Sequence, residues 1–137
     1  MSGIGRILMS VATAMYGLVP PIVDLGATHA LHPDWTPHAR MHMVWLVVTM
    51  SSIAVLALYF IWRHPDRRFG VHMGGLLGLC AFGGFFVSAA TAPLYGGSLH
   101  DKGGVPEVAG FIDANLLGFG LAIALLFIGW RAARHEA

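Results

Sequence analysis

Apolar residues in this chain are gathered into four long blocks rather than into short alternating runs. The blocks cover residues 4–23, 42–62, 71–94 and 111–130, and the polar residues concentrate between them. A helix needs roughly 20 apolar residues to cross about 30 Å of hydrocarbon, and every block has about that length. Because lipid offers no partner to free backbone groups, the blocks are expected to be helical. The pattern predicts an all-α fold, an integral membrane four-helix bundle formed by residues 1–137 as a single domain.

The ends of the blocks carry residues that are typical of helix ends in membranes. Pro20 and Pro21 are expected to bend or end the first helix, because proline removes a backbone donor. Trp62 and Trp130 close the second and fourth blocks, where interfacial aromatic side chains are common. These residues support the predicted boundaries.

Basic residues predict how the bundle sits in the membrane. Arg40 and Lys102 belong to segments on one side of the predicted membrane, and six arginines belong to segments on the other side. These six are Arg6, Arg63, Arg67, Arg68, Arg131 and Arg134. Since short cytoplasmic segments carry the excess of lysine and arginine, both termini are predicted to be cytoplasmic. The loops 24–41 and 95–110 of this inner-membrane protein then face the periplasm or the cell exterior.

The amino-acid composition indicates which kinds of molecule the protein can bind. The chain is 56% hydrophobic and 11% charged, whereas soluble domains carry about 25% charged residues. A net charge of +1 provides no basic face for nucleic acid, so the lipid bilayer is the expected partner. The single cysteine, Cys80, excludes an internal disulfide and a thiolate-rich metal site.

Small residues recur at a spacing of four in the third and fourth blocks. The pairs are Gly74/Gly78, Gly118/Ala122 and Gly120/Ala124. Such spacing lets helix backbones approach closely, either within one bundle or between copies in a homo-oligomer.

Potential metal ligands are concentrated on the predicted outer side. Five of the eight histidines and five of the seven acidic residues lie there. They are His29, His32, His38, His42, His100, Asp24, Asp34, Asp101, Glu107 and Asp113. Imidazoles and carboxylates with few matching cations favour a divalent transition metal, and the lack of thiolates points to iron, zinc, manganese or copper.

His38 and His42 form the best-defined ligand pair. Pro37 suits the first turn of a helix, so the two histidines are expected one turn apart on one helix face. Trp45, Thr49 and Ser52 continue that face. This polar stripe predicts that the face looks into the bundle rather than toward lipid. The alternative is that both histidines are merely solvated at the membrane surface.

The remaining metal-ligand candidates have simpler alternatives. His29 and His32 are three residues apart and could be ligands, or could be cap and turn residues. His100 lies in a glycine-rich loop. Glu107 is expected to begin the fourth helix after Pro106, where a carboxylate also favours the positive end of the helix dipole.

Four residues are candidates for catalysis. Asp113 and Asp24 are predicted near the outer hydrocarbon edge, where an ionisable group is costly and therefore often functional. Their alternatives are a structural ion pair for Asp113 and a solvated helix end for Asp24. Arg40 could hold an anionic group or neutralise one of these acids. Tyr95, in line with Thr91 and Ser88, could donate a proton or be a packing aromatic.

The stretch 32–42, with the sequence HPDWTPHARMH, resembles a motif of a family of small four-helix integral membrane proteins of unassigned function. The resemblance covers residues 24–45 and extends to the other helices only in hydropathy. It implies a four-helix membrane fold and carries no activity.

Three functions fit these features. The first is a membrane metalloenzyme that oxidises or isomerises a lipophilic small molecule, with ligands from His38, His42, a loop histidine and a carboxylate. The second is a metal-free acid–base isomerase or cyclase, in which Asp113 or Asp24 protonates an alkene and a histidine removes a proton. The third is a non-enzymatic accessory subunit that binds metal or haem. Haem is less favoured, since only His42 lies near a span on the outer side.

Overall fold

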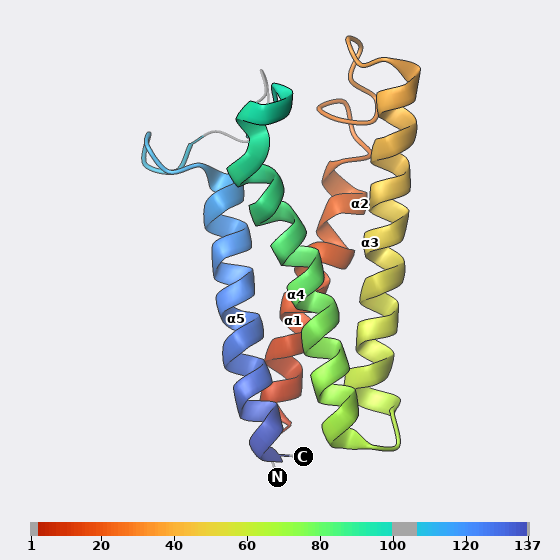
Figure 1. Ribbon diagram of the computed structural model, residues 1–137, viewed down its shortest axis with the longest axis vertical. Coiled ribbons are helices and arrows are strands. Elements are labelled where there is room, and N and C mark those ends of the chain that lie inside the picture. Colours follow the sequence, from red (N-terminus) through yellow and green to blue (C-terminus); the bar gives the residue numbers. More distant parts are fainter. Residues whose placement is uncertain (1–2, 100–106, 137) are drawn as a thin grey trace.

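The computed structural model describes residues 3–99 and 107–136, and its regular elements in those ranges are helices (Figure 1). Their bounds are α1 Ile4–Gly17, α2 Val19–Val23, α3 Pro37–Arg63, α4 Arg67–Thr91, the 3-10 helix η1 Ala92–Tyr95 and α5 Ala114–Glu136. Among the described residues, four helical segments are long and apolar enough to cross a membrane. These spans are Ile4–Val23, Pro37–Arg63, Arg67–Tyr95 and Ala114–Glu136. The predicted all-α architecture with four spans is confirmed.

The first span is broken at Leu18, between α1 and α2. Pro20 and Pro21 have no amide hydrogen, so the carbonyls four residues earlier lose their usual helical donors. The Ser51 hydroxyl of α3 donates instead to the Gly17 carbonyl at 2.9 Å. This bond satisfies a backbone group for which lipid would offer no partner. The predicted bend is confirmed, and it lies just before the proline pair.

Helix α3 begins earlier than the apolar block from which it was predicted. Thr36 caps it by accepting a hydrogen bond from the Ala39 amide at 3.2 Å. Pro37 occupies the first turn, as predicted, since its fixed φ angle suits that position. The helix therefore starts at Pro37 rather than at His42, and both histidines of the predicted pair lie within it.

Helix α5 begins later than predicted, and the expectation that Glu107 begins the fourth helix is wrong. Val108 and Ile112 form an isolated β-bridge, with the Val108 amide donating to the Ile112 carbonyl at 2.8 Å. Within this turn, Ala109 and Gly110 have φ angles of 54° and 75°. A right-handed helix cannot pass through residues in that region. Glu107 is therefore exposed ahead of a turn and is separated from the start of α5 at Ala114.

Helix α1 is the central element of the bundle, because it contacts α3, α4 and α5. In the described part of the chain, α3 contacts α4, α4 contacts α5, and α3 makes no contact with α5. The core is formed mainly by Met9, Ala12, Tyr16, Ala54, Ile61, Val71, Ala81, Phe82, Ala122, Leu126 and Ala133. Many other large apolar side chains face outward, as is typical of helices long and apolar enough to cross a membrane.

Glycines allow the helices to pack closely at the end of the bundle that carries both termini, called here the terminus end (Figure 1). A Cβ atom on Gly129 would lie 2.8 Å from the Gly5 carbonyl oxygen and 2.8 Å from the Met9 amide nitrogen. Near the middle of α4, a Cβ atom on Gly78 would lie 2.9 Å from the Leu126 side chain of α5. Gly78 belongs to the predicted Gly74/Gly78 pair, so part of the small-residue spacing serves packing within the bundle.

Candidate functional site

A cavity of about 440 Å³ lies between the helices at the opposite end of the bundle, called here the cavity end. All of the spans contribute to it. Its wall is mainly apolar and aromatic, formed by Tyr16, Pro20, Leu46, Val47, Met50, Ala81, Gly84, Phe85, Leu99 and Phe119. The polar residues that line it are Asp24, His29, Ser88, Ser98 and Asn115. A mostly apolar cavity of this size with a few polar groups is typical of a small-molecule site.

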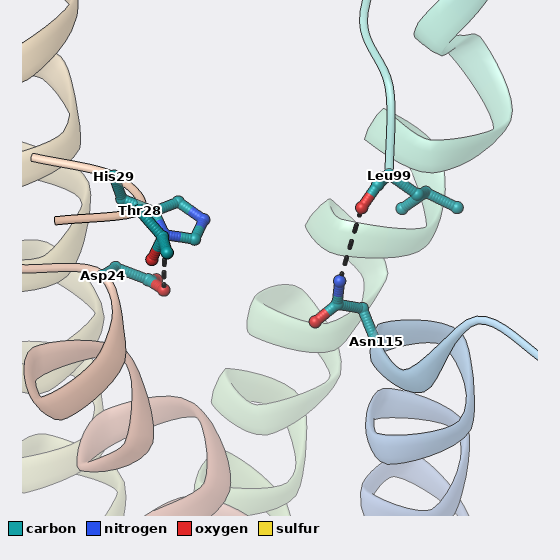
Figure 2. A network of polar contacts seen from close by, with 5 residues as sticks. All are labelled: Asp24, Thr28, His29, Leu99 and Asn115. Carbon is teal, nitrogen blue, oxygen red and sulfur yellow. Dashed lines mark hydrogen bonds and ion pairs between the residues drawn. The ribbon is translucent and has the colours of Figure 1, made fainter. Parts of the chain in front are cut away.

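Asp24 and His29 form the polar pair on one wall of the cavity (Figure 2). Asp24 directly follows α2, and its carbonyl accepts a hydrogen bond from the Ala30 amide at 3.0 Å, which folds the loop back on itself. The Asp24 Oδ1 atom lies 3.9 Å from the Nδ1 atom of His29. The Thr28 hydroxyl is hydrogen-bonded to the same ring nitrogen at 3.0 Å. The other ring nitrogen, Nε2, lies on the side of the ring away from Asp24 (Figure 2).

The environment of Asp24 favours its protonated form. Its side chain is only 26% exposed, and burial raises the pKa of this carboxyl above its ordinary value of 3.8. The nearby imidazole of His29 acts in the opposite direction and limits the rise in pKa. A carboxyl group with a raised pKa beside an apolar cavity is suited to donating a proton.

Asn115 faces this pair from the first turn of α5 (Figure 2). Its side-chain amide donates to the Leu99 carbonyl at 3.5 Å, and both residues line the cavity. Sequence reasoning missed Asn115. A usable signal existed, because Asn115 is the only asparagine in a chain that has no glutamine. A carboxamide at the start of an apolar span is unusual enough to single out.

Aromatic residues form the inner wall of the cavity. The rings of Phe85 and Phe119 are stacked, with centroids 3.9 Å apart and an angle of 13° between planes. Tyr16 is 1% exposed and packs edge-on against Phe82, with centroids 5.4 Å apart. Sequence reasoning missed these residues, and no signal distinguished them from other aromatic residues in apolar spans.

His38 and His42 come together as their spacing predicted. Their Nε2 atoms are 3.0 Å apart, so one ring donates a hydrogen bond to the other. Both side chains are exposed, and neither lines the main cavity.

The prediction that the polar stripe after His42 faces into the bundle is wrong. Trp45 on that face is 61% exposed, whereas Val47 is 2% exposed and points inward. Ser52 is also exposed, and its hydroxyl donates to the Val48 carbonyl of the same helix at 2.8 Å. A serine that bonds to its own helix needs no partner in the bundle, so it can face lipid.

The other predicted metal ligands lie apart from this pair. His29 lines the cavity, and the Nδ1 atom of His32 accepts a hydrogen bond from the Asp34 amide at 3.2 Å. Glu107 is exposed, and His100 lies outside the described residues. Within residues 3–99 and 107–136, no group of three or more histidine, cysteine or acidic side chains is arranged to hold a metal ion.

Of the four predicted catalytic residues, Asp24 lines the cavity. Asp113 caps α5, because its Oδ1 atom accepts hydrogen bonds from the Asn115 and Leu116 amides at 2.8 and 3.0 Å. Arg40 and Tyr95 bind backbone carbonyls: Arg40 donates to the His32 carbonyl at 2.8 Å, and the exposed Tyr95 donates to the Ser88 carbonyl at 2.7 Å.

Comparisons with protein-family models, with curated proteins and with solved structures found no match to the chain.

Proposed function

We propose that this chain is a membrane-embedded acid–base enzyme that isomerises a lipophilic small molecule. The observation that carries the proposal is the Asp24–His29 pair, with 3.9 Å between Oδ1 and Nδ1, on the wall of a largely apolar cavity. Of the functions considered from the sequence, this one uses the residues that line the cavity.

The chemistry would be the movement of a carbon–carbon double bond. Protonated Asp24 gives its proton to one alkene carbon, and the π electrons of the double bond form the new C–H bond. His29 removes a proton from a neighbouring carbon through Nε2, and those C–H electrons form the shifted double bond. The imidazolium then gives its Nδ1 proton to the nearby Asp24 carboxylate. Exchange of protons between the neutral ring and water returns His29 to the tautomer in which Nε2 carries no proton, so both groups are restored. No oxidant, reductant or co-reactant is consumed.

The position of the pair suits this reaction. The two carbons that gain and lose protons in such a shift are close together, so an acid and a base on neighbouring side chains of one cavity wall can act on both. Burial keeps Asp24 protonated at a higher pH than an exposed aspartate, which supports its role as the acid. The cavity volume, about 440 Å³, lies within the range of about 300–1,000 Å³ usual for small-molecule sites.

The proposed orientation places both termini in the cytoplasm and the cavity end toward the periplasm or exterior. It rests on the six arginines whose positions in the chain are near the termini and the α3–α4 connection. A cysteine introduced at Ser98 should be labelled from outside in intact cells, whereas one introduced at Arg67 should be spared.

Deuterium incorporation tests the proposed reaction while the substrate is still unidentified. Purified protein is incubated with a total lipid extract in D₂O, and the lipids are searched by mass spectrometry for species that gain carbon-bound deuterium. The wild type should label at least one species. Asp24→Asn and His29→Gln should each reduce the rate by about 100-fold or more, as expected for loss of a general acid or base.

Two further variants complete this test. Gly84→Leu should also abolish labelling, because Gly84 lines the cavity and a Cβ atom there meets nothing within 4 Å. His38→Ala/His42→Ala should label normally, because neither residue lines the cavity. Wild-type labelling that persists in both Asp24→Asn and His29→Gln would refute the proposal.

A metal-dependent enzyme is the second candidate, and the pair His38/His42 favours it. Two ring nitrogens 3.0 Å apart on one helix face could share a divalent metal if further ligands were supplied. Elemental analysis of purified protein tests this candidate. Bound metal that is lost in His38→Ala/His42→Ala would support it, and metal-free wild type would contradict it.

A further inference from the structure

A groove of about 330 Å³ lies on α5 at the terminus end, far along the helix from the cavity. Its walls are Phe127, Trp130, Arg131 and Arg134. Counted from Phe127, these residues lie at positions i, i+3, i+4 and i+7, so they share one helix face. At 1.5 Å per residue, the face runs about 10 Å from two aromatic rings to two guanidinium groups.

We propose that this groove is a binding site for an anionic phospholipid. The lipid phosphate contacts Arg131 and Arg134, and the adjoining part of an acyl chain lies along Phe127 and Trp130. Along the helix, apolar side chains are followed by cationic ones, in the same order as the acyl tail and the charged headgroup of such a lipid.

The aromatic half of the groove is held in place by neighbouring side chains and by α4. The rings of Phe127 and Trp130 are nearly parallel, with 11° between planes and 6.5 Å between centroids. Trp130 lies against Gly75 so closely that a Cβ atom there would overlap the indole ring. His72 packs edge-on against the same ring at 6.0 Å. An apolar surface that is already ordered binds an acyl chain with a smaller entropic cost.

The cationic half lacks a carboxylate partner in the described part of the chain. The ion pair found within residues 3–99 and 107–136 joins Asp24 to His29 at the cavity end. Glu136, near the end of the same helix, accepts a hydrogen bond from the Gly5 amide at 3.2 Å. Guanidinium groups without a protein counter-ion bind phosphate oxygens well, because their planar donors match the geometry of the anion.

A lipid explains both halves of the groove together. A free phosphate ion would use the two arginines and leave the aromatic surface without a role. A zwitterionic lipid would use the aromatic surface, but its headgroup has no net negative charge to complement the two arginines.

Native mass spectrometry of the detergent-purified full chain tests the proposal. The protein is titrated with phosphatidylglycerol and with phosphatidylcholine of the same acyl chains. Phosphatidylglycerol should bind more tightly. Arg131→Gln/Arg134→Gln should weaken its binding about 30-fold, since each basic residue near a membrane surface contributes about fivefold.

Arg67→Gln/Arg68→Gln is the matched control, because it removes the same charge at the start of α4, outside the groove. It should change phosphatidylglycerol binding less than about threefold. Phe127→Ala should weaken the binding of phosphatidylglycerol while leaving thermal stability nearly unchanged, because the Phe127 side chain is 48% exposed.

Four results would overturn the proposal. They are equal losses in the two arginine double variants, equal affinity for the two lipids, unchanged lipid binding in Phe127→Ala, and complete displacement of phosphatidylglycerol by an equal concentration of inorganic phosphate. The first would indicate general charge attraction, and the last a site for a free anion.

Discussion

Gly5 and Gly129 at the terminus end of the bundle are covered by neighbouring helices, whereas Gly84 and Gly118 in the helices of the cavity end face open space. A Cβ atom on Gly129 would lie 2.8 Å from backbone atoms of α1, and one on Gly5 would overlap the backbone at Ala133. A Cβ atom on Gly84 or Gly118 would meet nothing within 4 Å. The same residue type thus permits close helix contact at one end and leaves room for a cavity at the other.

This difference indicates that the terminus end holds the helices together and the cavity end forms the candidate site. Close backbone contacts hold α1 against α5 at the terminus end. In lipid, helices associate mainly through such close packing, because the hydrophobic effect contributes little to their association. Helices α3 and α4 are joined by a short connection at that end and diverge toward the cavity end (Figure 1). Polar groups such as Asp24, His29 and Asn115 are placed where the packing is open.

The largest expected effect comes from placing the same side chain at both ends of α5. Gly129→Leu should destabilise the fold by more than about 3 kcal/mol, because the new side chain meets backbone that cannot move independently. Gly118→Leu should change stability by less than about 1 kcal/mol, because its Cβ atom meets no neighbour. Thermal unfolding in detergent measures both. Similar losses in the two variants would break the contrast between the two ends.

A smaller effect on stability is expected at Asp113, which we interpret as a structural acid, in contrast to Asp24, the proposed functional acid. Asp113→Ala removes the cap of α5 and should destabilise the protein by about 1 kcal/mol. Asp113→Asn should retain most of the stability, since asparagine also caps helices. Both variants should retain deuterium labelling of the substrate. Loss of labelling in a stably folded Asp113→Asn would instead assign Asp113 a role in proton transfer.

The smallest expected effect is the dependence of stability on the charge of Asp24. Because burial raises its folded-state pKa, the contribution of Asp24 to stability is complete below about pH 3.8 and falls as pH rises through the raised value. Asp24→Asn has no such loss, so it should become slightly more stable than wild type as pH rises from acidic to neutral. Unfolding temperatures of the two proteins across this range measure the difference. A wild type that gains stability over the variant with rising pH would show that the ionised form is favoured.

Sequence reasoning reached some parts of the site and missed others for identifiable reasons. The helical spacing of His38 and His42 depends on the local backbone, and this pairing is confirmed. Asp24 was identified from its depth at the end of the first span, and it lines the cavity. The start of α5 was misplaced at Glu107, because a turn in which Ala109 and Gly110 have positive φ angles separates Glu107 from the helix. Hydropathy carries no information about that backbone conformation.

The sequence by itself determined the properties that depend on neighbouring residues and on the solvent. Block length and apolar content produced the four spans, and Pro20 and Pro21 produced the break in the first one. Only the tertiary structure decided which face of each helix looks inward. It turned Val47 inward and Trp45 outward, and it brought Asn115 opposite Asp24 and His29. The physical reason is that lipid and protein interior are both apolar, so hydropathy alone cannot distinguish the face that packs from the face that meets lipid.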